Sequence, residues 1–291
     1  MAELPTLAAF VRARAEEARL VMVTAYDVPT ARAAAAGGVD ALLVGDSLGQ
    51  VLLGHDTTLS VTLDDMLHHA RAVVRAVTGL PVVVDLPYGS FHVDPRDTVR
   101  QALRLVREAG VQAVKLEGGR KRADHIAALL DAEIPVMGHL GLTPQSVNVL
   151  GGYRVQGRED EQAEVLLDEA RFLNEAGCFA MVLECIPADL ARRITEAVEI
   201  PTIGIGAGVE CTGQVLVLHD LLGLSGEFKP RFVKRYADLG AAAGDAVADY
   251  AREVREGTFP APEHTYGRGR RKAGSGTGKG YLSGLEEGGS G

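Results

Sequence analysis

A short apolar segment followed by an amphipathic stretch recurs along most of this chain. The apolar segments are rich in β-branched residues and do not alternate with polar positions, as expected of strands buried on both faces of a parallel sheet. We predict eight strands, at residues 21–25, 41–44, 81–86, 111–116, 134–137, 179–183, 201–205 and 215–218. Helical patterns lie between most of them, at residues 63–77, 97–109, 124–130, 161–176 and 188–198.

This order of elements predicts an α/β fold, and specifically a (β/α)₈ TIM barrel. A doubly wound sheet is the main alternative, because it has the same alternation of strands and helices. Two features favour the barrel: no GxGxxG follows the first strand, and polar residues end nearly every strand instead of gathering at one switch point. The helical pattern at residues 6–18 precedes the first strand and is expected to cap the bottom of the barrel.

The chain has 291 residues, of which 46% are hydrophobic and 24% charged, as in a soluble globular protein. We expect one barrel domain over residues 1–266. Residues 267–291 are rich in Gly and Ser and poor in apolar residues, so this tail is expected to be disordered.

Charge and segment patterns exclude several classes of function. The net charge of -9 disfavours a nucleic-acid surface, because phosphate binding needs clustered Lys and Arg. The N-terminus lacks the apolar core of a signal peptide, and no run approaches the roughly 18 apolar residues of a membrane helix. The three cysteines, Cys178, Cys185 and Cys211, have no metal-ligand spacing and suggest reduced thiols. We therefore expect a cytoplasmic protein that binds neither membranes nor nucleic acids.

Acidic residues follow the predicted strands at the rim where a barrel carries its chemistry. Asp46 and Asp85 each follow a near-continuous apolar run, and Glu117 follows a third. Charged groups beside buried strands are costly unless they are paired or bind a metal. These three acids offer only oxygen ligands, so we predict a site for Mg²⁺ rather than Zn²⁺, with Glu117 acting through water. The alternative is that they pair with Lys115 or with arginines of the loops.

Three further residues are candidates at this rim. Lys115 is two positions from Glu117, so both face the same side of a strand, where Lys115 would hold a substrate carboxylate or pair with Glu117. Glu184 ends an apolar run that would raise its pKa toward the range of a general base, unless backbone donors make it structural. His139 would orient Glu184 or substrate, or would be a structural histidine.

Two glycine-containing segments complete the rim. GIGAG at 204–208 lacks the spacing of a nucleotide-binding loop and is expected to let backbone approach a substrate. The long segment at 141–158 is typical of an active-site loop or lid, with a packing excursion as the alternative.

Several motifs together resemble ketopantoate hydroxymethyltransferase, also called 3-methyl-2-oxobutanoate hydroxymethyltransferase. They are VTAYD (23–27), LVGDSLG (43–49), GHDTTL (54–59), VKLEGG (114–119), GHLGLTPQSVN (138–148), LECIP (183–187) and GIGAG (204–208). The match runs in order from about residue 20 to residue 264. The family usually ends near EHTY (263–266), so the tail lies outside the resemblance. Thr212 stands where the family commonly has Asp, at a position without an assigned role.

The resemblance implies a barrel of the phosphoenolpyruvate mutase and isocitrate lyase type. It implies transfer of a one-carbon unit from 5,10-methylenetetrahydrofolate to 3-methyl-2-oxobutanoate through a Mg²⁺-stabilised enolate, giving 2-dehydropantoate and tetrahydrofolate in pantothenate and coenzyme A biosynthesis. The family is cytoplasmic and typically decameric. Its metal ligands fall on Asp46, Asp85 and Glu117, its substrate contacts on Asp46, Ser47, Asp85 and Lys115, and its proton acceptor on Glu184.

Two other functions are weighed against this one. A lyase or mutase of the same superfamily would share the metal carboxylates and an oxo-acid substrate, but the KKCGH-type loop often used by such lyases is absent from the sequence. A non-catalytic binding barrel would not require acids at several strand ends.

Overall fold

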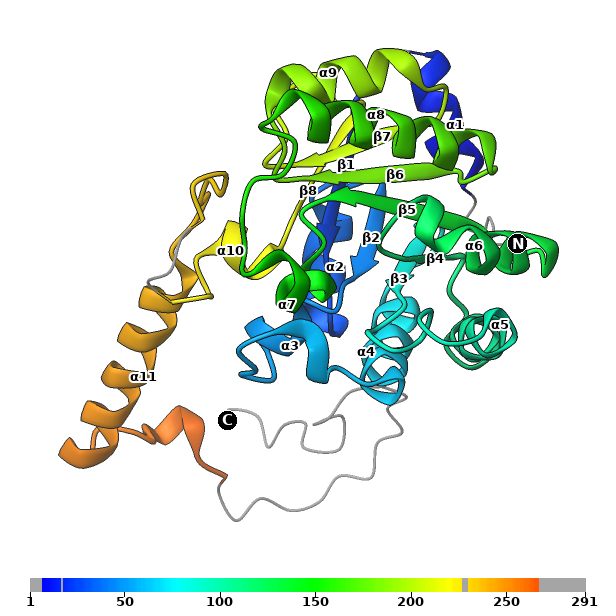
Figure 1. The fold of residues 1–291 in the computed structure, drawn as a ribbon. Helices are drawn as coiled ribbons and strands as arrows, with labels where there is room; N and C mark the ends of the chain where they lie inside the picture. Colours follow the sequence, from blue (N-terminus) through cyan, green and yellow to red (C-terminus); the bar gives the residue numbers. More distant parts are fainter. Residues whose placement is uncertain (1–6, 17, 227–229, 267–291) are drawn as a thin grey trace. The chain divides into compact units, whose positions relative to one another are not determined.

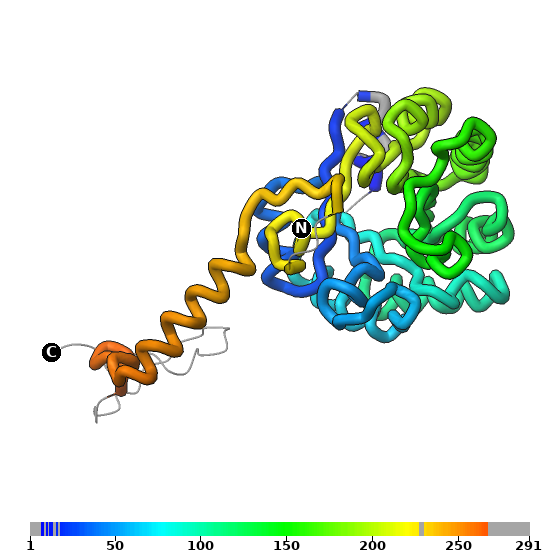
Figure 2. The backbone as a smooth tube through the Cα atoms, turned by 60° about the vertical axis from the view of Figure 1, so that its left-hand side comes forward, coloured from blue at the N-terminus to red at the C-terminus, as the bar shows by residue number. Residues whose placement is uncertain are grey.

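The computed structural model describes residues 7–16, 18–226 and 230–266. Eight parallel strands close into a barrel in the order β1 to β8, which confirms the predicted (β/α)₈ fold and rules out the doubly wound sheet (Figure 1). In Figure 2 the chain passes around the ring in sequence order, from blue through cyan and green to yellow. The strands are Leu20–Thr24, Ala41–Val44, Val82–Asp85, Ala113–Lys115, Val136–Gly141, Ala180–Glu184, Thr202–Ile205 and Gly213–Leu216.

Helices surround the barrel and connect successive strands. All five predicted helices are present, as α4 (Leu63–Ala76), α5 (Pro95–Arg104), α6 (Ala123–Asp131), α8 (Asp160–Glu175) and α9 (Ala188–Ala197). The pattern at residues 97–109 is not one regular helix, because α5 passes into a π-helical turn at Leu105–Ala109 that ends at Gly110 in the left-handed conformation. The structure adds α2 (Val28–Ala36), α3 (Leu48–Val51), α7 (Val147–Leu150), α10 (Leu218–Leu222) and the short helical turns η1 and η3 to η5; the π-helical turn is η2.

Side chains pointing inward fill the lower part of the barrel. They form one apolar cluster with members from all eight strands, including Met22, Val83 and Met137. Helix α1 (Ala8–Ala15) adds Phe10 and Ala13 to this cluster, and Phe10 is only 2% exposed. The predicted N-terminal helix therefore closes the bottom of the barrel, and it leaves the opposite end for a site.

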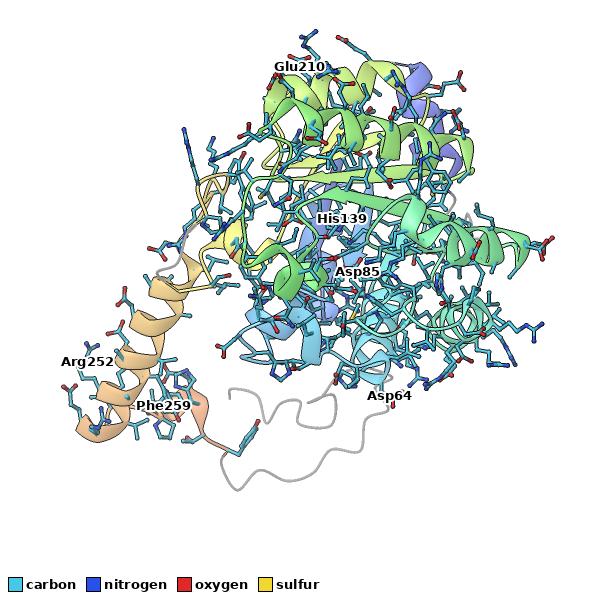
Figure 3. All side chains as sticks on the ribbon, in the orientation of Figure 1. Asp64, Asp85, His139, Glu210, Arg252 and Phe259 are labelled. Carbon is cyan, nitrogen blue, oxygen red and sulfur yellow. The ribbon has the colours of Figure 1, made fainter. Side chains whose placement is uncertain are left out.

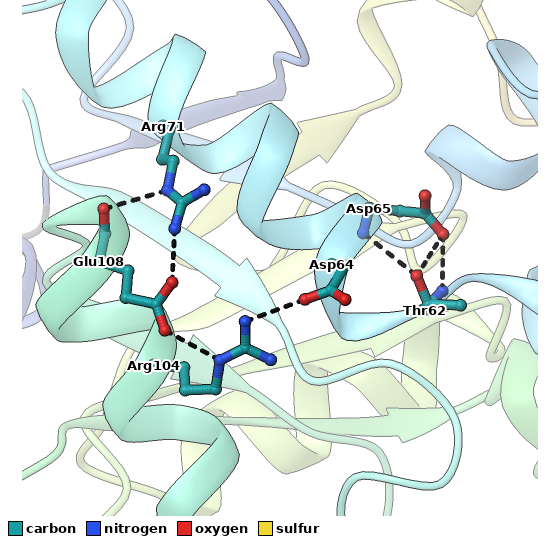
Figure 4. Close-up of polar contacts among 6 residues, drawn as sticks. All are labelled: Thr62, Asp64, Asp65, Arg71, Arg104 and Glu108. Carbon is teal, nitrogen blue, oxygen red and sulfur yellow. Dashed lines mark hydrogen bonds and ion pairs between the residues drawn. The ribbon is translucent and has the colours of Figure 1, made fainter.

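Polar contacts fasten α4 at its start and along its outer face (Figure 4). Thr62 and Asp65 form a reciprocal capping box at the N-terminus of the helix. Arg71 of α4 pairs with Glu108, and Arg104 pairs with both Glu108 and Asp64. These ion pairs are exposed, so each contributes little to stability and the main contribution of this face is the apolar packing beneath it.

The chain divides into two compact units, residues 1–237 and 238–291, each described by itself. The barrel and its cavity belong to the first unit. In the second, α11 (Leu239–Glu256) is capped by Asp238, whose side chain accepts a hydrogen bond from the Ala241 N–H, and is followed by Gly257.

The expected single domain over residues 1–266 stays a prediction, and the expected disordered tail lies outside the described residues. Among the helices that the structure describes, none is long and apolar enough to cross a membrane.

Candidate active site

A cavity of about 360 Å³ lies at the C-terminal end of the barrel strands. All seven residues predicted for the site line it, although they come from five strands, β2 to β6, and the segments that follow them: Asp46, Ser47, Asp85, Lys115, Glu117, His139 and Glu184. In Figure 3, Asp85 and His139 lie within the ring of strands, whereas Asp64 and Glu210 lie outside it. The structure thus brings the predicted set together.

The site continues the inward-facing layers of the barrel. Side chains two positions apart on a strand face the same side, so Asp85 follows the buried Val83, and Lys115 follows the buried Ala113. Glu117 lies two residues further on and lines the same cavity, as the spacing predicted. The bottom of the barrel is therefore apolar, and the next layer toward the rim is charged.

Asp46 and Asp85 form a close pair of buried acids. They are 5% and 4% exposed, and the backbone N–H of Asp46 donates to Asp85 Oδ2 at 3.1 Å. Burial and the charge of Asp85 raise the pKa of Asp46 to about 7. A buried carboxylate whose pKa is raised by the charge of a neighbouring carboxylate is in an arrangement that a bound cation would relieve.

Glu117 is buried near this pair but is held separately. The backbone N–H of Gln145 donates to Glu117 Oε2 at 2.9 Å, and burial, followed by the charge of Asp46, raises the pKa of Glu117 well above its usual value. Within residues 7–16, 18–226 and 230–266, no group of three or more His, Cys, Asp or Glu side chains is arranged to hold a metal ion. Asp46 and Asp85 present only carboxylate oxygens, the donor type that Mg²⁺ takes in proteins.

Lys115 connects the acid pair to His139. Its Nζ lies 3.1 Å from Asp85 Oδ1 and 3.1 Å from His139 Nδ1. Burial opposes the lysine charge, but Asp85, Glu117 and Asp46 together outweigh it and raise the pKa of Lys115. The alternative in which the acids pair with Lys115 is therefore found for Asp85, whereas the predicted ion pair of Lys115 with Glu117 is not found among the described residues.

His139 lies between Lys115 and Glu184, within β5 rather than at its end. Burial and the nearby Lys115 charge lower the pKa of His139 well below its usual value, so the ring is neutral. An ammonium group has only donors, so Nδ1 accepts and the proton lies on Nε2. That Nε2 is 3.2 Å from Glu184 Oε2, but it makes no hydrogen bond among the described residues. The predicted role of His139 in orienting Glu184 or substrate stays a prediction.

Glu184 reaches the cavity from the end of β6, where its side chain is 17% exposed. Burial raises its pKa to about 7, although Lys115 opposes this shift. The backbone around it is closely held: the Leu142 N–H donates to Glu184 O at 2.8 Å, and a Cβ at Gly141 would lie 2.2 Å from the same oxygen. Gly141 also has φ +92°, so this approach requires glycine.

Sequence reasoning missed two residues that support the site. Tyr26 is fully buried, and its OH lies 2.8 Å from Ser47 Oγ. Gln145 is 6% exposed and contacts both Asp46 and Glu117. Both lie in motifs on which the family resemblance rests, VTAYD and GHLGLTPQSVN. The spacing of residues in a sequence does not show whether such a side chain contacts site residues, caps a helix or packs in the core. Asp27 illustrates the difficulty, because this strand-end acid caps α2.

The segment at 141–158 borders the cavity, as predicted for an active-site loop. Leu142, Pro144, Tyr153, Arg154 and Val155 all line it. The Gln156 N–H donates to Cys185 O at 3.0 Å, which ties the far part of this segment to the end of β6. From the GIGAG segment, Ile205 lines the cavity and is the partner of Glu184 in the pairing of β6 with β7.

Comparison with known proteins identifies the family. A family model described as ketopantoate hydroxymethyltransferase matches residues 5–262. The chain belongs to this family. A 3-methyl-2-oxobutanoate hydroxymethyltransferase of Nitratidesulfovibrio vulgaris is 58% identical over 263 residues, covering 90% of this chain and 86% of the relative. One from Oleidesulfovibrio alaskensis is 56% identical over 260 residues, covering 89% and 90%.

Solved structures support the fold of the family member described here. A 2,3-dimethylmalate lyase, a member of the PEP mutase/isocitrate lyase superfamily, matches with a TM-score of 0.58 at 18% identity, over 90% of this chain and 93% of that chain. A phosphonopyruvate hydrolase in complex with oxalate and Mg²⁺ matches with a TM-score of 0.56 at 14% identity, over 88% and 92%. At these identities the likeness shows the barrel type alone.

Proposed function

We propose that this chain is a 3-methyl-2-oxobutanoate hydroxymethyltransferase. It transfers a one-carbon unit from 5,10-methylenetetrahydrofolate to 3-methyl-2-oxobutanoate and yields 2-dehydropantoate and tetrahydrofolate, in pantothenate and coenzyme A biosynthesis. The names of the relatives at 56–58% identity support the reaction. The observation that carries it in this chain is that acids, a lysine and a perturbed glutamate from four strands, β2, β3, β4 and β6, line one cavity.

Asp46 and Asp85 would hold a Mg²⁺ ion, with Glu117 acting through a water molecule. The buried acid pair, in which the charge of Asp85 helps to raise the pKa of Asp46, supports this assignment. When bound, the ion would act as a Lewis acid toward the oxygens of the oxo acid and stabilise the developing enolate charge by several kcal/mol.

Ser47 and Lys115 would bind and orient the oxo acid. Ser47 Oγ is placed by the buried Tyr26 hydroxyl, so it would meet the substrate carboxylate from a fixed position. Lys115 is 5% exposed and keeps its charge, so it would neutralise anionic charge in a site from which most water is excluded.

Glu184 would accept the proton from C3 of the oxo acid. Its pKa of about 7 suits a base that works near neutral pH. The Nε2–H of the neutral His139 faces Glu184 Oε2 and would favour one orientation of the carboxylate. The electron pair left at C3 forms the new bond to the folate-borne methylene carbon, and water supplies the hydroxyl group of that carbon. Both bonds from that carbon to the folate nitrogens break, and the two nitrogens receive the proton that left C3 and the remaining proton of the water.

Cellular and assembly properties follow the family resemblance. We expect a cytoplasmic homo-oligomer, decameric as is typical of the family, that binds a 2-oxo acid and a folate but neither membranes nor nucleic acids. The formal charge of -9 agrees with the last expectation.

The proposed function is tested by assaying 2-dehydropantoate formation from the oxo acid and methylenetetrahydrofolate, with Mg²⁺ and with EDTA. Product formation that requires Mg²⁺ is expected. Cleavage of a C–C or P–C bond in an oxo-acid substrate, without product in this assay, would instead favour a lyase or mutase. No rise in melting temperature with saturating Mg²⁺ and 3-methyl-2-oxobutanoate would favour a scaffold without this site.

A further inference from the structure

Gln145 joins two acids that reach the cavity from different strands. It lies in the short turn η4 (Pro144–Ser146), after β5, and is 6% exposed. Its side-chain Nε2 donates to Asp46 Oδ2 at 2.8 Å, and its backbone N–H donates to Glu117 Oε2 at 2.9 Å. One residue thus contacts a carboxylate at the end of β2 and another at the end of β4.

The orientation of the Gln145 amide is determined by its neighbours. Besides Asp46, Nε2 donates to the carbonyl oxygen of Leu86 at 3.0 Å. A carbonyl oxygen can only accept, so the NH₂ end must face Leu86 O, and its two hydrogens then serve Leu86 O and Asp46 Oδ2. Oε1 points away, buried and without a hydrogen-bond partner among the described residues. A flipped amide would place Oε1 against the Asp46 carboxylate.

The turn that carries Gln145 is itself held in place next to the proposed base. Ser146 N–H donates to Thr143 O at 2.8 Å, which closes the turn. Three residues before Gln145, the Leu142 N–H donates to Glu184 O at 2.8 Å. The segment after β5 therefore contacts Asp46, Glu117 and the backbone of Glu184 within four residues of chain.

We propose that Gln145 is a positioning residue that sets the orientation of Asp46 and its separation from Glu117. This inference rests on the proposed metal site for its functional meaning. Gln145 does not line the cavity, so it acts through the two acids and not by touching substrate. Its amide presents Asp46 in one rotamer, and its backbone N–H holds Glu117 whatever the side chain at position 145.

Replacing Gln145 by Met separates these two contributions, because Met has a similar length, keeps the backbone N–H and lacks the donor. The probe is Mn²⁺, whose binding is measured directly by its electron paramagnetic resonance signal without substrates. Partners that orient metal ligands typically change metal affinity by about 10–100-fold when removed. We expect Gln145→Met to weaken Mn²⁺ binding by about that factor and to alter the spectrum of the bound ion.

Gln112→Met is the matched control. Gln112 also uses its amide to contact backbone, accepting from the Val82 N–H and donating to Gly110 O, but it lies outside the cavity. We expect this variant to bind Mn²⁺ with wild-type affinity and spectrum. Equal affinities and spectra for Gln145→Met and the wild type would overturn the inference.

A second arm needs no metal. Thermal unfolding midpoints of the metal-free wild type, Gln145→Met, Asp46→Ala and the double variant form a cycle. Gln145→Met should lower the midpoint less in the Asp46→Ala background, because the bond to Asp46 is already lost there. Equal losses in both backgrounds would contradict the positioning role.

The Mn²⁺ binding experiment and the unfolding cycle distinguish failure of the proposed metal site from failure of the positioning role of Gln145. If the wild type binds no Mn²⁺, the proposed metal site is wrong, while the unfolding cycle still decides whether Gln145 orients Asp46. If Gln145→Met does not fold, Gln145→Asn takes its place in both arms. Asn keeps the amide but is one methylene shorter, and we expect weaker Mn²⁺ binding in the same direction. Wild-type binding by a folded Gln145→Asn together with an additive cycle would refute the inference.

Discussion

Lys115 and Asp85 are direct partners across β3 and β4, and Lys115 Nζ lies 3.1 Å from Asp85 Oδ1. Both side chains are almost fully buried, at 6% and 5% exposure. The pair places one positive charge beside Asp85, while Asp46 lies on the other side of the same carboxylate. The register of β3 and β4 therefore places the positive charge of Lys115 next to the buried acids.

Replacing Lys115 by Met is expected to destabilise the metal-free protein by about 3–5 kcal/mol, because it leaves a buried carboxylate without its partner. Urea unfolding measures the change. Mg²⁺ should restore part of the lost stability, since the cation would take over the compensation. Lys121→Met, on the η3 turn (Arg120–Arg122), is the control and should change stability little, because its side chain is exposed. A loss no larger than that of the control would mean that the pair does not compensate buried charge.

Replacing Glu184 by Gln should abolish exchange of the C3 proton of 3-methyl-2-oxobutanoate with solvent, because an amide cannot accept that proton. Substrate binding should change little, since size and burial are kept. Nuclear magnetic resonance in D₂O follows the exchange, and calorimetry measures the binding. Exchange at the wild-type rate would remove Glu184 as the base.

The pH profile of this exchange should report the raised pKa of Glu184, about 7. The base is active as the carboxylate, so the rate should fall as pH decreases through about 7, approaching tenfold per pH unit below it. A glutamate at its ordinary pKa would instead give a constant rate from about pH 5.5 upward. A rate that does not change between pH 5.5 and 8 would contradict the assignment of this pKa.

Replacing Asp85 by Ala should greatly weaken the Mg²⁺ dependence of product formation, because one of two proposed direct ligands is lost. We expect activity to fall at least 100-fold, with a larger Mg²⁺ requirement for what remains. Titration of activity with Mg²⁺ measures both effects. Wild-type activity that is the same in EDTA and in Mg²⁺ would show that the acids serve another purpose.

Gly141→Ala should lower activity strongly without removing any side chain of the site. The new Cβ would overlap Glu184 O, and φ +92° is strained for alanine, so the end of β6 must shift. Gly151→Ala is a useful control, because its φ is +68° but its Cβ would meet nothing within 4 Å. Activity loss of similar size in both variants would point to backbone strain rather than to displacement of Glu184.

The apolar runs of the chain predict the order of the strands, and the acids that follow them predict the rim. All eight predicted strands are present, because strands buried on both faces carry uninterrupted apolar runs. Boundaries differ most in β5, predicted at residues 134–137 and found at Val136–Gly141. Its last four residues, Gly138 to Gly141, have weak strand preference, but pairing with β6 over five residues extends the strand. His139 therefore lies inside a strand and not after one.

By itself, the sequence determined the barrel and the acids that follow its strands. It also determined that Lys115 and Glu117 face the same side, because burial and the two-residue period of a strand act locally. Only the tertiary structure decided which groups meet. Gln145 donates to Asp46 across 99 positions of sequence, and Lys115 pairs with Asp85 rather than with the nearby Glu117. Such contacts depend on how parallel strands are registered and how the connecting segments fold over the rim, and no local pattern carries that information.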